Sequence, residues 1–293
     1  MEKEYFQDGE NYAIKQDKVV KVIQYKATSS IEIVDTSNKI NGFKNITKIS
    51  KGEYYDAREN AIKKYCLVEK KTNESLKKSM KNLERKIRNN FTGANNELFI
   101  TLTTREMTNI ADIEKYFDEF WNRLKSVYQD LEYVYVIERN SIRESWHLHL
   151  LVKATEHKTL YIPNSTIEEL WQKGYTKTSR ITDKAVYNDI NEKDHMIYVE
   201  KKLMSDGIVG IEKVIKYMTK IHTKQGLPKG MKCYNTSREL KMPKMKKVEY
   251  CKICDEMNSE YYLEKEKTIL VRDIETDAII NKIKKEIWIK DKN

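Results

Sequence analysis

This 293-residue chain has few of the residues that make a chain flexible or cross-link it. It contains 3 prolines, 9 glycines and 4 cysteines, with no proline-rich linker, low-complexity tract or internal repeat. So few cysteines exclude a disulfide-based scaffold. Cys251 and Cys254 form one C-x-x-C pair, whereas a structural zinc site needs four ligands. The composition therefore predicts a protein that folds around an ordinary hydrophobic core.

Long hydrophobic runs are also missing. The first residues, "MEKEYFQDGE", lack the apolar stretch of a signal peptide, and no segment approaches the roughly 18 apolar residues that span a bilayer. Apolar residues make up 39% of the chain, and the 19 tyrosines among them can help to close a core. We therefore expect a soluble, cytoplasmic protein without a membrane partner.

The charge is unevenly distributed along the chain. The formal net charge is +10, and residues 200–250 hold 13 Lys or Arg against 5 Asp or Glu. A basic block of this kind suits a polyanion such as nucleic acid. The alternative is a solvated, lysine-rich surface.

Hydrophobic periodicity predicts the elements of the first half of the chain. They are a hairpin over 18–34 that turns at Ser29 and Ser30, a helix over 73–90, a strand over 98–104, a helix over 109–129, and strands over 132–139 and 146–153. The second helix places one apolar stripe on one side, made by Ile113, Phe117, Phe120, Leu124 and Val127, and Asn109 is its expected cap. The polar turn "NSIRES" predicts that the last two strands pair as an antiparallel hairpin.

The second half of the chain is less regular. The predicted elements are a helix over 165–172, a strand over 175–181, a helix over 210–224 ended by Gly226 and Pro228, a strand over 267–273 and an amphipathic segment over 276–288. The order of elements suits an α+β fold with a small antiparallel sheet and helices over one face. We expect three parts: a β-rich extension over 1–70, a central domain over 71–245 and a C-terminal α/β extension over 246–293.

The segment "WHLHLLV" carries the first chemical motif. Alternate side chains of a strand point to opposite faces, so His147 and His149 project from one face while Leu148, Leu150 and Val152 pack on the other. Two imidazoles that converge in this way are candidate metal ligands, although such a pair also occurs on solvated faces.

Glu138 lies on the strand expected to pair with the two histidines. A hairpin of that length brings its carboxylate beside the imidazoles, and Glu144 is a rival. Two nitrogen ligands and one oxygen ligand accept Mg²⁺, Mn²⁺ or Zn²⁺, so the identity of the metal stays open.

The predicted helix over 210–224 carries a tyrosine between an apolar and a basic face. Tyr217 lies at the border between the apolar arc and a cluster formed by Lys213, Lys220 and Lys224. A tyrosine beside lysines is well placed to meet a phosphate. The alternative is that Tyr217 only fills a half-buried position.

These motifs together resemble the HUH endonucleases that initiate rolling-circle replication. "LFITLTT", "HLHLL" and "YMTK" occur in the order and spacing of the three motifs of that family. Neighbouring segments are similar to replication proteins of the filamentous-phage type found in phages and plasmids: "MKNLERKIRNNF", "LWQKGY" and "YNTSRELKMP". The resemblance covers residues 75–245.

The resemblance implies a five-stranded antiparallel sheet of ferredoxin-like or RRM-like build and a set of roles. Glu138, His147 and His149 would bind Mg²⁺ or Mn²⁺, Tyr217 would be the nucleophile, and Lys220 its partner. Origin single-stranded DNA, with or without a hairpin, would be nicked with a 5′-phosphotyrosine link and a free 3′-hydroxyl, and later rejoined.

Two features differ from some relatives or from larger initiators. Ile221 stands where some relatives have a second tyrosine, so a single-tyrosine scheme is expected. No G-x-x-x-x-G-K-[ST] motif occurs, so unwinding would depend on a host helicase and synthesis on a host DNA polymerase.

Other side chains are candidates for DNA contacts. The strand threonines Thr101 and Thr103 share the face of the histidines, although strand preference alone accounts for many threonines. The remaining predicted DNA contacts are Lys213, Lys216, Lys224 and Arg238. The N-terminal helix and the basic 241–247 segment are expected to bind origin DNA, and His157, His195 and His222 are interpreted as ordinary histidines.

Three alternatives stay open from the sequence. A relaxase is disfavoured because its tyrosine typically precedes a three-histidine cluster, whereas Tyr217 follows two histidines. A transposase of the same superfamily is the second alternative. A sequence-specific DNA-binding regulator that keeps the fold without the chemistry is the third, and convergence of the four motif side chains would distinguish it from a nickase.

Overall fold

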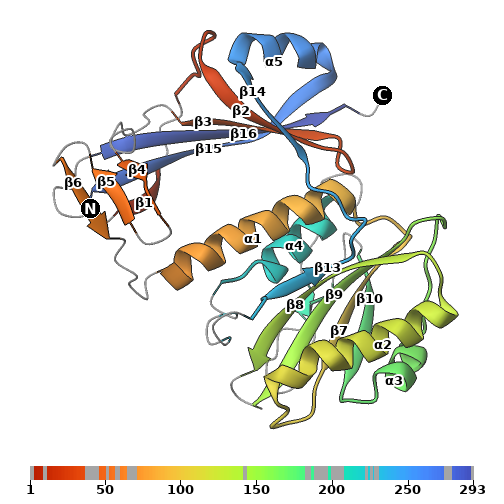
Figure 1. The fold of residues 1–293 in the computed structure, drawn as a ribbon. Helices are drawn as coiled ribbons and strands as arrows, with labels where there is room; N and C mark the ends of the chain where they lie inside the picture. The colour runs from red at the N-terminus through yellow and green to blue at the C-terminus, as the bar shows by residue number, and fades with distance from the viewer. Residues whose placement is uncertain are drawn as a thin grey trace. The chain divides into compact units, whose positions relative to one another are not determined.

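The computed structural model describes residues 3–8, 12–36, 46–50, 53–56, 60–64, 71–140, 144–181, 186–187, 197–198, 208–221, 224, 227, 231–273 and 279–291. The chain divides into two compact units, each described by itself below. Unit 1 combines residues 1–75 with 243–293, and unit 2 comprises residues 76–242. Figure 1 labels the elements of both units.

Unit 2 contains the expected five-stranded antiparallel sheet. Its strands are β7 (Glu97–Thr103), β8 (Leu131–Asn140), β9 (Ser145–Ala154), β10 (Thr176–Arg180) and β13 (Tyr234–Thr236). They lie in the order β10-β7-β9-β8-β13, so β9 is central and β10 and β13 are the edges. The predicted β8–β9 hairpin is confirmed, and the ferredoxin-like or RRM-like assignment stays a prediction.

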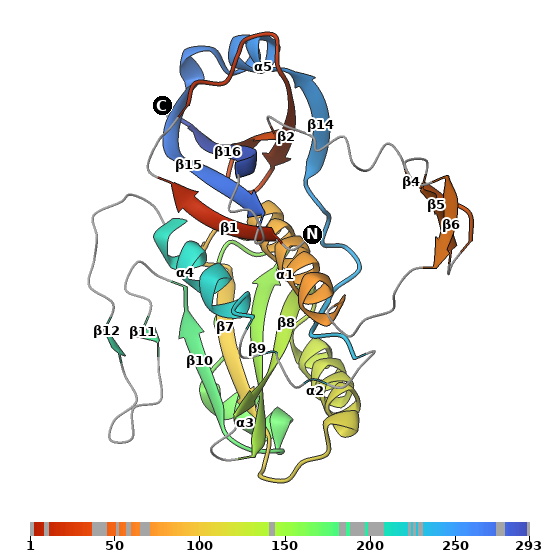
Figure 2. The same ribbon diagram turned by 90° about the vertical axis from the view of Figure 1, so that its left-hand side faces the viewer.

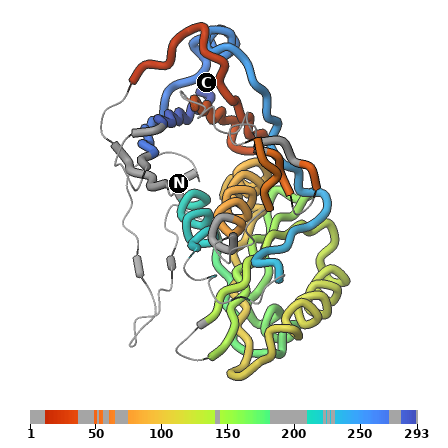
Figure 3. Tube along the Cα trace, turned by 60° about the vertical axis from the view of Figure 1, so that its left-hand side comes forward, coloured from red at the N-terminus to blue at the C-terminus, as the bar shows by residue number. Residues whose placement is uncertain are grey.

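Helices cover both faces of this sheet, so the prediction that they cover one face is wrong. The helices are α1 (Lys71–Asn90), α2 (Ile113–Val127), α3 (Asn164–Trp171) and α4 (Ile208–Met218). α2 and α3 pack on the face of Leu148 and Leu150, while α1 and α4 pack on the face of Val136 and Leu151. Both faces of the central strands carry apolar side chains, and each must be covered to leave water. Figures 1 and 3 show α1 and α4 side by side.

The start of the second helix is as predicted, and its end differs. Asn109 caps the short 3₁₀ helix η2 (Ile110–Asp112) that leads into α2, because its side-chain oxygen accepts a hydrogen bond of 3.0 Å from the Ala111 N–H. Val127 is 60% exposed rather than part of the buried stripe. It is the last residue of α2, and the chain becomes extended at Tyr128.

α4 is shorter than the helix predicted over 210–224. It ends at Met218, where the Thr219 hydroxyl and N–H both donate to the Ile215 carbonyl, and the Lys220 N–H donates to the Tyr217 carbonyl. A threonine hydroxyl that binds the preceding turn and a tighter final bond are common ways to satisfy a helix end. Lys220 and Lys224 therefore follow the helix and do not lie on it.

Unit 1 is built on a six-stranded antiparallel sheet that takes strands from both ends of the chain. The strands are β1 (Lys3–Asp8), β2 (Val19–Tyr25), β3 (Ser30–Thr36), β14 (Lys244–Glu249), β15 (Tyr261–Asp273) and β16 (Ile279–Lys290). Their order is β1-β15-β16-β3-β2-β14. The hairpin predicted at Ser29 and Ser30 is confirmed, and Ser29 takes the left-handed conformation of the turn, with φ 48°. The amphipathic segment over 276–288 forms most of β16.

Smaller elements complete the two units (Figure 2). They are α5 (Tyr250–Met257), the 3₁₀ helix η4 (Asn258–Glu260), a sheet of β4 (Ile46–Lys48), β5 (Glu53–Asp56) and β6 (Ala61–Lys64), and the pair β11 (Val186–Tyr187) and β12 (Ile197–Tyr198). α5 packs Ile253 and Met257 into the core of unit 1. Among the described helices, none combines the length and the apolar character that crossing a bilayer would require.

Candidate active site

The register of β7, β9 and β8 gathers the motif residues on one face of the unit 2 sheet. Thr101 pairs with His149 and Thr103 with His147 across β7 and β9, and Glu138 pairs with His147 across β8 and β9. The residues between the histidines pack on the opposite face with α2 and α3. The predicted projection of both imidazoles from a single face is therefore confirmed, and that face is the one covered by α1 and α4.

The two threonines of β7 contact the histidines directly. The Thr101 hydroxyl lies 3.3 Å from His149 Nδ1, and the Thr103 hydroxyl lies 3.4 Å from His147 Nδ1. Because each imidazole is held through Nδ1, its Nε2 is the nitrogen left for chemistry on this face. The threonines line the site, as predicted, and here they position the imidazoles.

Glu138 links the histidine pair to a buried lysine. Its Oε2 lies 3.2 Å from His149 Nε2, and its Oε1 accepts a hydrogen bond of 2.6 Å from Lys224 Nζ. Burial by itself would raise the pKa of Glu138, but the hydrogen bond and charge of His149 and the Lys224 ammonium outweigh it. The pKa of Glu138 is therefore held well below its usual range. Its rival, Glu144, is exposed.

Lys224 was predicted as an exposed DNA contact, and the structure corrects this. Only 2% of the residue is exposed. Burial lowers the pKa of its ammonium, and the ion pair with Glu138 opposes that shift. The sequence prediction failed because helical periodicity continues through residue 224, whereas the chain leaves the helix after Met218.

Tyr217 reaches the same point from α4. Its hydroxyl lies 3.1 Å from His149 Nε2, and the two rings meet edge to face with centroids 4.7 Å apart. Lys220 Nζ lies 4.8 Å from the centre of the Tyr217 ring, which places a positive charge beside the phenol. Glu138, His149 and Tyr217 thus converge although they lie on three different elements.

Phe99 completes the wall of the site and was missed in the sequence. Its ring lies parallel to His149, with centroids 5.8 Å apart, and edge to face with Tyr217, with centroids 6.2 Å apart. The alternation in "LFITLTT" contains the signal, because Phe99 lies two residues before Thr101 and so shares its face.

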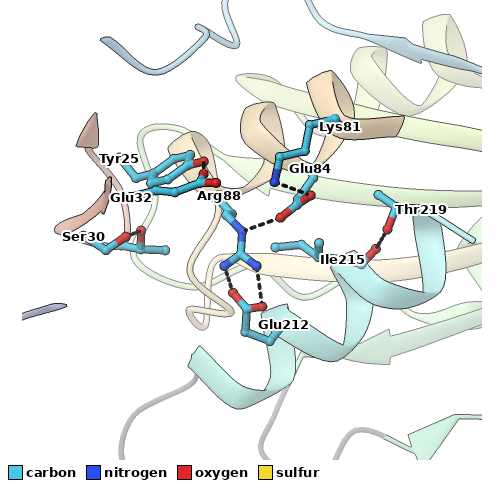
Figure 4. A network of polar contacts seen from close by, with 10 residues as sticks. Tyr25, Ser30, Glu32, Lys81, Glu84, Arg88, Glu212, Ile215 and Thr219 are labelled. Carbon is cyan, nitrogen blue, oxygen red and sulfur yellow. Dashed lines mark hydrogen bonds and ion pairs between the residues drawn. The ribbon is translucent and has the colours of Figure 1, made fainter. Parts of the chain in front are cut away.

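An ion-pair network fastens α4 to α1. Arg88 of α1 binds both carboxylate oxygens of Glu212 on α4, and its Nε donates to Glu84 at 3.3 Å (Figure 4). Bidentate guanidinium–carboxylate pairs fix orientation as well as distance. This contact sets the position of the helix that carries Tyr217.

The other predicted DNA contacts lie away from the converging side chains. Lys216 of α4 and Arg238 after β13 are exposed. Lys213 of α4 is half-buried, and its Nζ has no hydrogen-bond partner within the described residues. His195 and His222 lie outside the described residues, and His157 is exposed.

A metal ion fits the donor chemistry of this site better than its present arrangement. Glu138, His147 and His149 offer the nitrogen and oxygen donors that divalent ions accept. Yet the described part of the chain has no group of three or more His, Cys, Asp or Glu side chains placed to hold a metal. Both Glu138 oxygens are engaged, one by Lys224 and one by His149. The metal site therefore stays a prediction.

Comparison with known proteins gives one match. Residues 97–203 match a family model described as a replication-associated protein of the ORF2 type. The match spans β7 to β10 and includes Glu138 and both site histidines, while Tyr217 and Lys220 lie beyond it. Neither the curated proteins nor the solved structures gave a match. The family match confirms the resemblance found in the motifs and supports a replication initiator of the phage or plasmid type.

Proposed function

We propose that this protein starts rolling-circle replication by nicking single-stranded DNA at an origin, with Tyr217 as the nucleophile. One observation carries the proposal: the Tyr217 hydroxyl lies 3.1 Å from His149 Nε2, which itself contacts Glu138. These residues are brought together from α4, β9 and β8. A DNA-binding regulator has no need of such convergence, which favours the nickase over that alternative.

The reaction is a transesterification that conserves one phosphodiester bond. The Tyr217 oxygen attacks the scissile phosphorus, the bond from phosphorus to the 3′-oxygen breaks, and a 5′-phosphotyrosine ester forms. The phenolic proton leaves as the oxygen attacks, and the departing 3′-oxygen takes up a proton to become a hydroxyl. Lys220 supplies positive charge beside the phenol as negative charge develops. Reversal of the same step rejoins the DNA.

Glu138, His147 and His149 would hold a divalent ion, Mg²⁺ or Mn²⁺. When bound, the ion would polarise the scissile phosphate and stabilise the charge that develops on it. Thr101 and Thr103 hold the Nδ1 sides of the histidines and so keep each Nε2 directed into the site. Lys224 keeps the Glu138 carboxylate ionised and oriented on this face.

Replication would then depend on partners that act on the nicked origin. The free 3′-hydroxyl is a primer for a host DNA polymerase. A host helicase would unwind the duplex, since the sequence has no P-loop motif.

The test is covalent capture of DNA by the full-length protein. The protein is incubated with a 3′-labelled single-stranded pool drawn from its own genetic element, with Mn²⁺ or with EDTA. We expect a labelled protein–DNA band with Mn²⁺ that is lost in EDTA and in Tyr217→Phe. Tyr161→Phe is the matched control, because Tyr161 is 72% exposed and lies outside the site.

Two results would contradict the proposal. An adduct that persists in Tyr217→Phe would assign the nucleophile to another residue. DNA binding without an adduct under any divalent metal would favour the regulator.

A further inference from the structure

Edge strand β10 borders the site face and continues its rows of side chains. Lys177 pairs with Thr101, which pairs in turn with His149. One row along, the Thr103 N–H donates to the Tyr175 carbonyl at 2.7 Å, and Thr103 pairs with His147. Alternation along β10 therefore puts Tyr175 and Lys177 on the face of the histidines. Figure 2 shows β10 beside β7 at the border of the sheet.

Tyr175 presents an exposed aromatic ring. The residue is 62% exposed. Within the part of the chain that the structure describes, its ring packs on no other ring and its hydroxyl has no hydrogen-bond partner. An exposed tyrosine without contacts contributes little to the fold, so its ring is available for a ligand.

Lys177 presents a cation without an anion. It is half-buried, and burial lowers the pKa of its ammonium with no carboxylate to oppose the shift. The described residues supply neither an ion pair nor a hydrogen bond to its Nζ. By contrast, Lys224 on the same face is paired with Glu138. Lys177 is thus ready to bind an anion without breaking an internal contact.

Gly174 fixes where these two side chains stand. A Cβ at this position would lie 2.1 Å from the Thr103 carbonyl oxygen, so only glycine lets the chain approach β7 so closely. The same oxygen accepts a hydrogen bond of 2.8 Å from the Trp171 indole N–H of α3. The start of β10 is therefore held rigidly beside the histidine row.

We propose that Tyr175 and Lys177 form a second contact site for the single-stranded DNA, next to the phosphate that Tyr217 attacks. Tyr175 stacks on a base and Lys177 binds a backbone phosphate. The two side chains lie about 7 Å apart along the strand, and β10 lies two strand spacings, about 10 Å, from β9. An aromatic ring beside a cation is the combination that sequence-tolerant single-strand binding uses. This inference rests on the proposed function and adds a substrate-holding site to it.

The test measures binding of fluorescein-labelled oligo(dT) by the full-length protein over a series of salt concentrations. Lys177→Gln is expected to reduce the slope of log affinity against log salt by about 0.7, the value for one phosphate contact on a single strand. Tyr175→Leu is expected to weaken binding about 5- to 100-fold with the slope unchanged. Tyr175→Phe and Lys177→Arg keep the ring and the charge and should bind like the unaltered protein.

Lys125→Gln is the control for loss of a charge alone, because Lys125 is an exposed residue of α2, which covers the opposite face of the sheet. If Tyr175→Leu and Lys177→Gln bind with unchanged affinity and slope, this second contact site is overturned. The covalent-capture assay, run in parallel, separates the two proposals. Capture by the unaltered protein with no effect of the β10 variants overturns only this site, whereas absence of both capture and oligo(dT) binding overturns the proposed function as well.

Discussion

The buried ion pair of Lys224 and Glu138 is the residue-scale feature with the largest expected effect on stability. Lys224→Met removes the ammonium that binds Glu138 Oε1 and leaves the buried carboxylate without that cation. Breaking a buried pair on one side costs about 3–5 kcal/mol. We expect the free energy of unfolding, measured by urea denaturation, to fall by about that amount.

A double substitution separates loss of the pair from loss of packing. In Lys224→Met with Glu138→Gln, neither charge of the pair remains, so most of the lost stability should return. Lys216→Met is the matched control, because Lys216 is exposed and its replacement should change stability by less than about 0.5 kcal/mol. Equal destabilisation in the single and double variants would show that the ion pair is not the cause.

At this scale the sequence predicted most of the site. Strand alternation was enough to place His147, His149 and both threonines on one face, since alternation does not depend on distant contacts. Lys224 could not be assigned, because its partner depends on where the helix ends. Phe99 was readable from the same alternation that identified Thr101.

The α1–α4 connection gives an element-scale prediction of pH dependence. Burial raises the pKa of Glu84, but the charges of Lys81 and Arg88 outweigh it, so the pKa in the folded protein is below its ordinary value. A lowered folded pKa means that the stabilisation is present above the unfolded value, about 4.3, and is lost as the pH falls through the folded value.

Glu84→Gln should therefore lower the melting temperature at neutral pH and make less difference near pH 3. The expected loss at pH 7 is about 1–2 kcal/mol, typical of hydrogen bonds to a charged group. Thermal denaturation followed by circular dichroism at both pH values measures it. Glu114→Gln, an exposed change in the first turn of α2, is the control. A difference that is the same at both pH values would contradict the role given to the Glu84 charge.

Elements with strong periodicity were predicted well, and their ends were not. The strands of unit 2 and helix α1 lie where the patterns place them. α4 stops early because Thr219 bonds back to Ile215, a local choice that hydrophobic spacing does not encode. Val127 has the spacing of a core residue but lies at a helix end, where the chain turns away.

The sharing of one sheet by both chain ends gives a prediction for the whole molecule. β16 lies between β15 and β3, so deleting residues 279–293 leaves β2 and β3 without their neighbour on that side. Backbone amides of β3 that bond to β16 should then exchange within about tenfold of the unprotected rate. Amides of β7 to β9 in unit 2 should keep their protection.

Hydrogen exchange followed by mass spectrometry measures both units in one experiment. A truncation after Lys290, the last residue of β16, keeps every strand and is the control. Loss of protection throughout unit 2 would show that the two units do not fold as separate cores.

The arrangement of the whole molecule was the part least accessible from the sequence. Periodicity identifies strands, but it does not say that β3 pairs with β16 across most of the chain. It also favoured helices on a single face, because the apolar residues facing α1 and α4 are interleaved with the polar residues of the site. Pairing over such distances depends on tertiary contacts.

The sheet of unit 1 also determines an order of events during synthesis. A ribosome finishes the whole of unit 2, a continuous segment, before it reaches β15 and β16. Thr36 must wait for its partner Ile283, which at about 5–20 residues per second is a delay of roughly 12–50 s. A nascent chain halted in that interval would already carry Tyr217 and the histidine pair while its first strands still lacked the other half of their sheet.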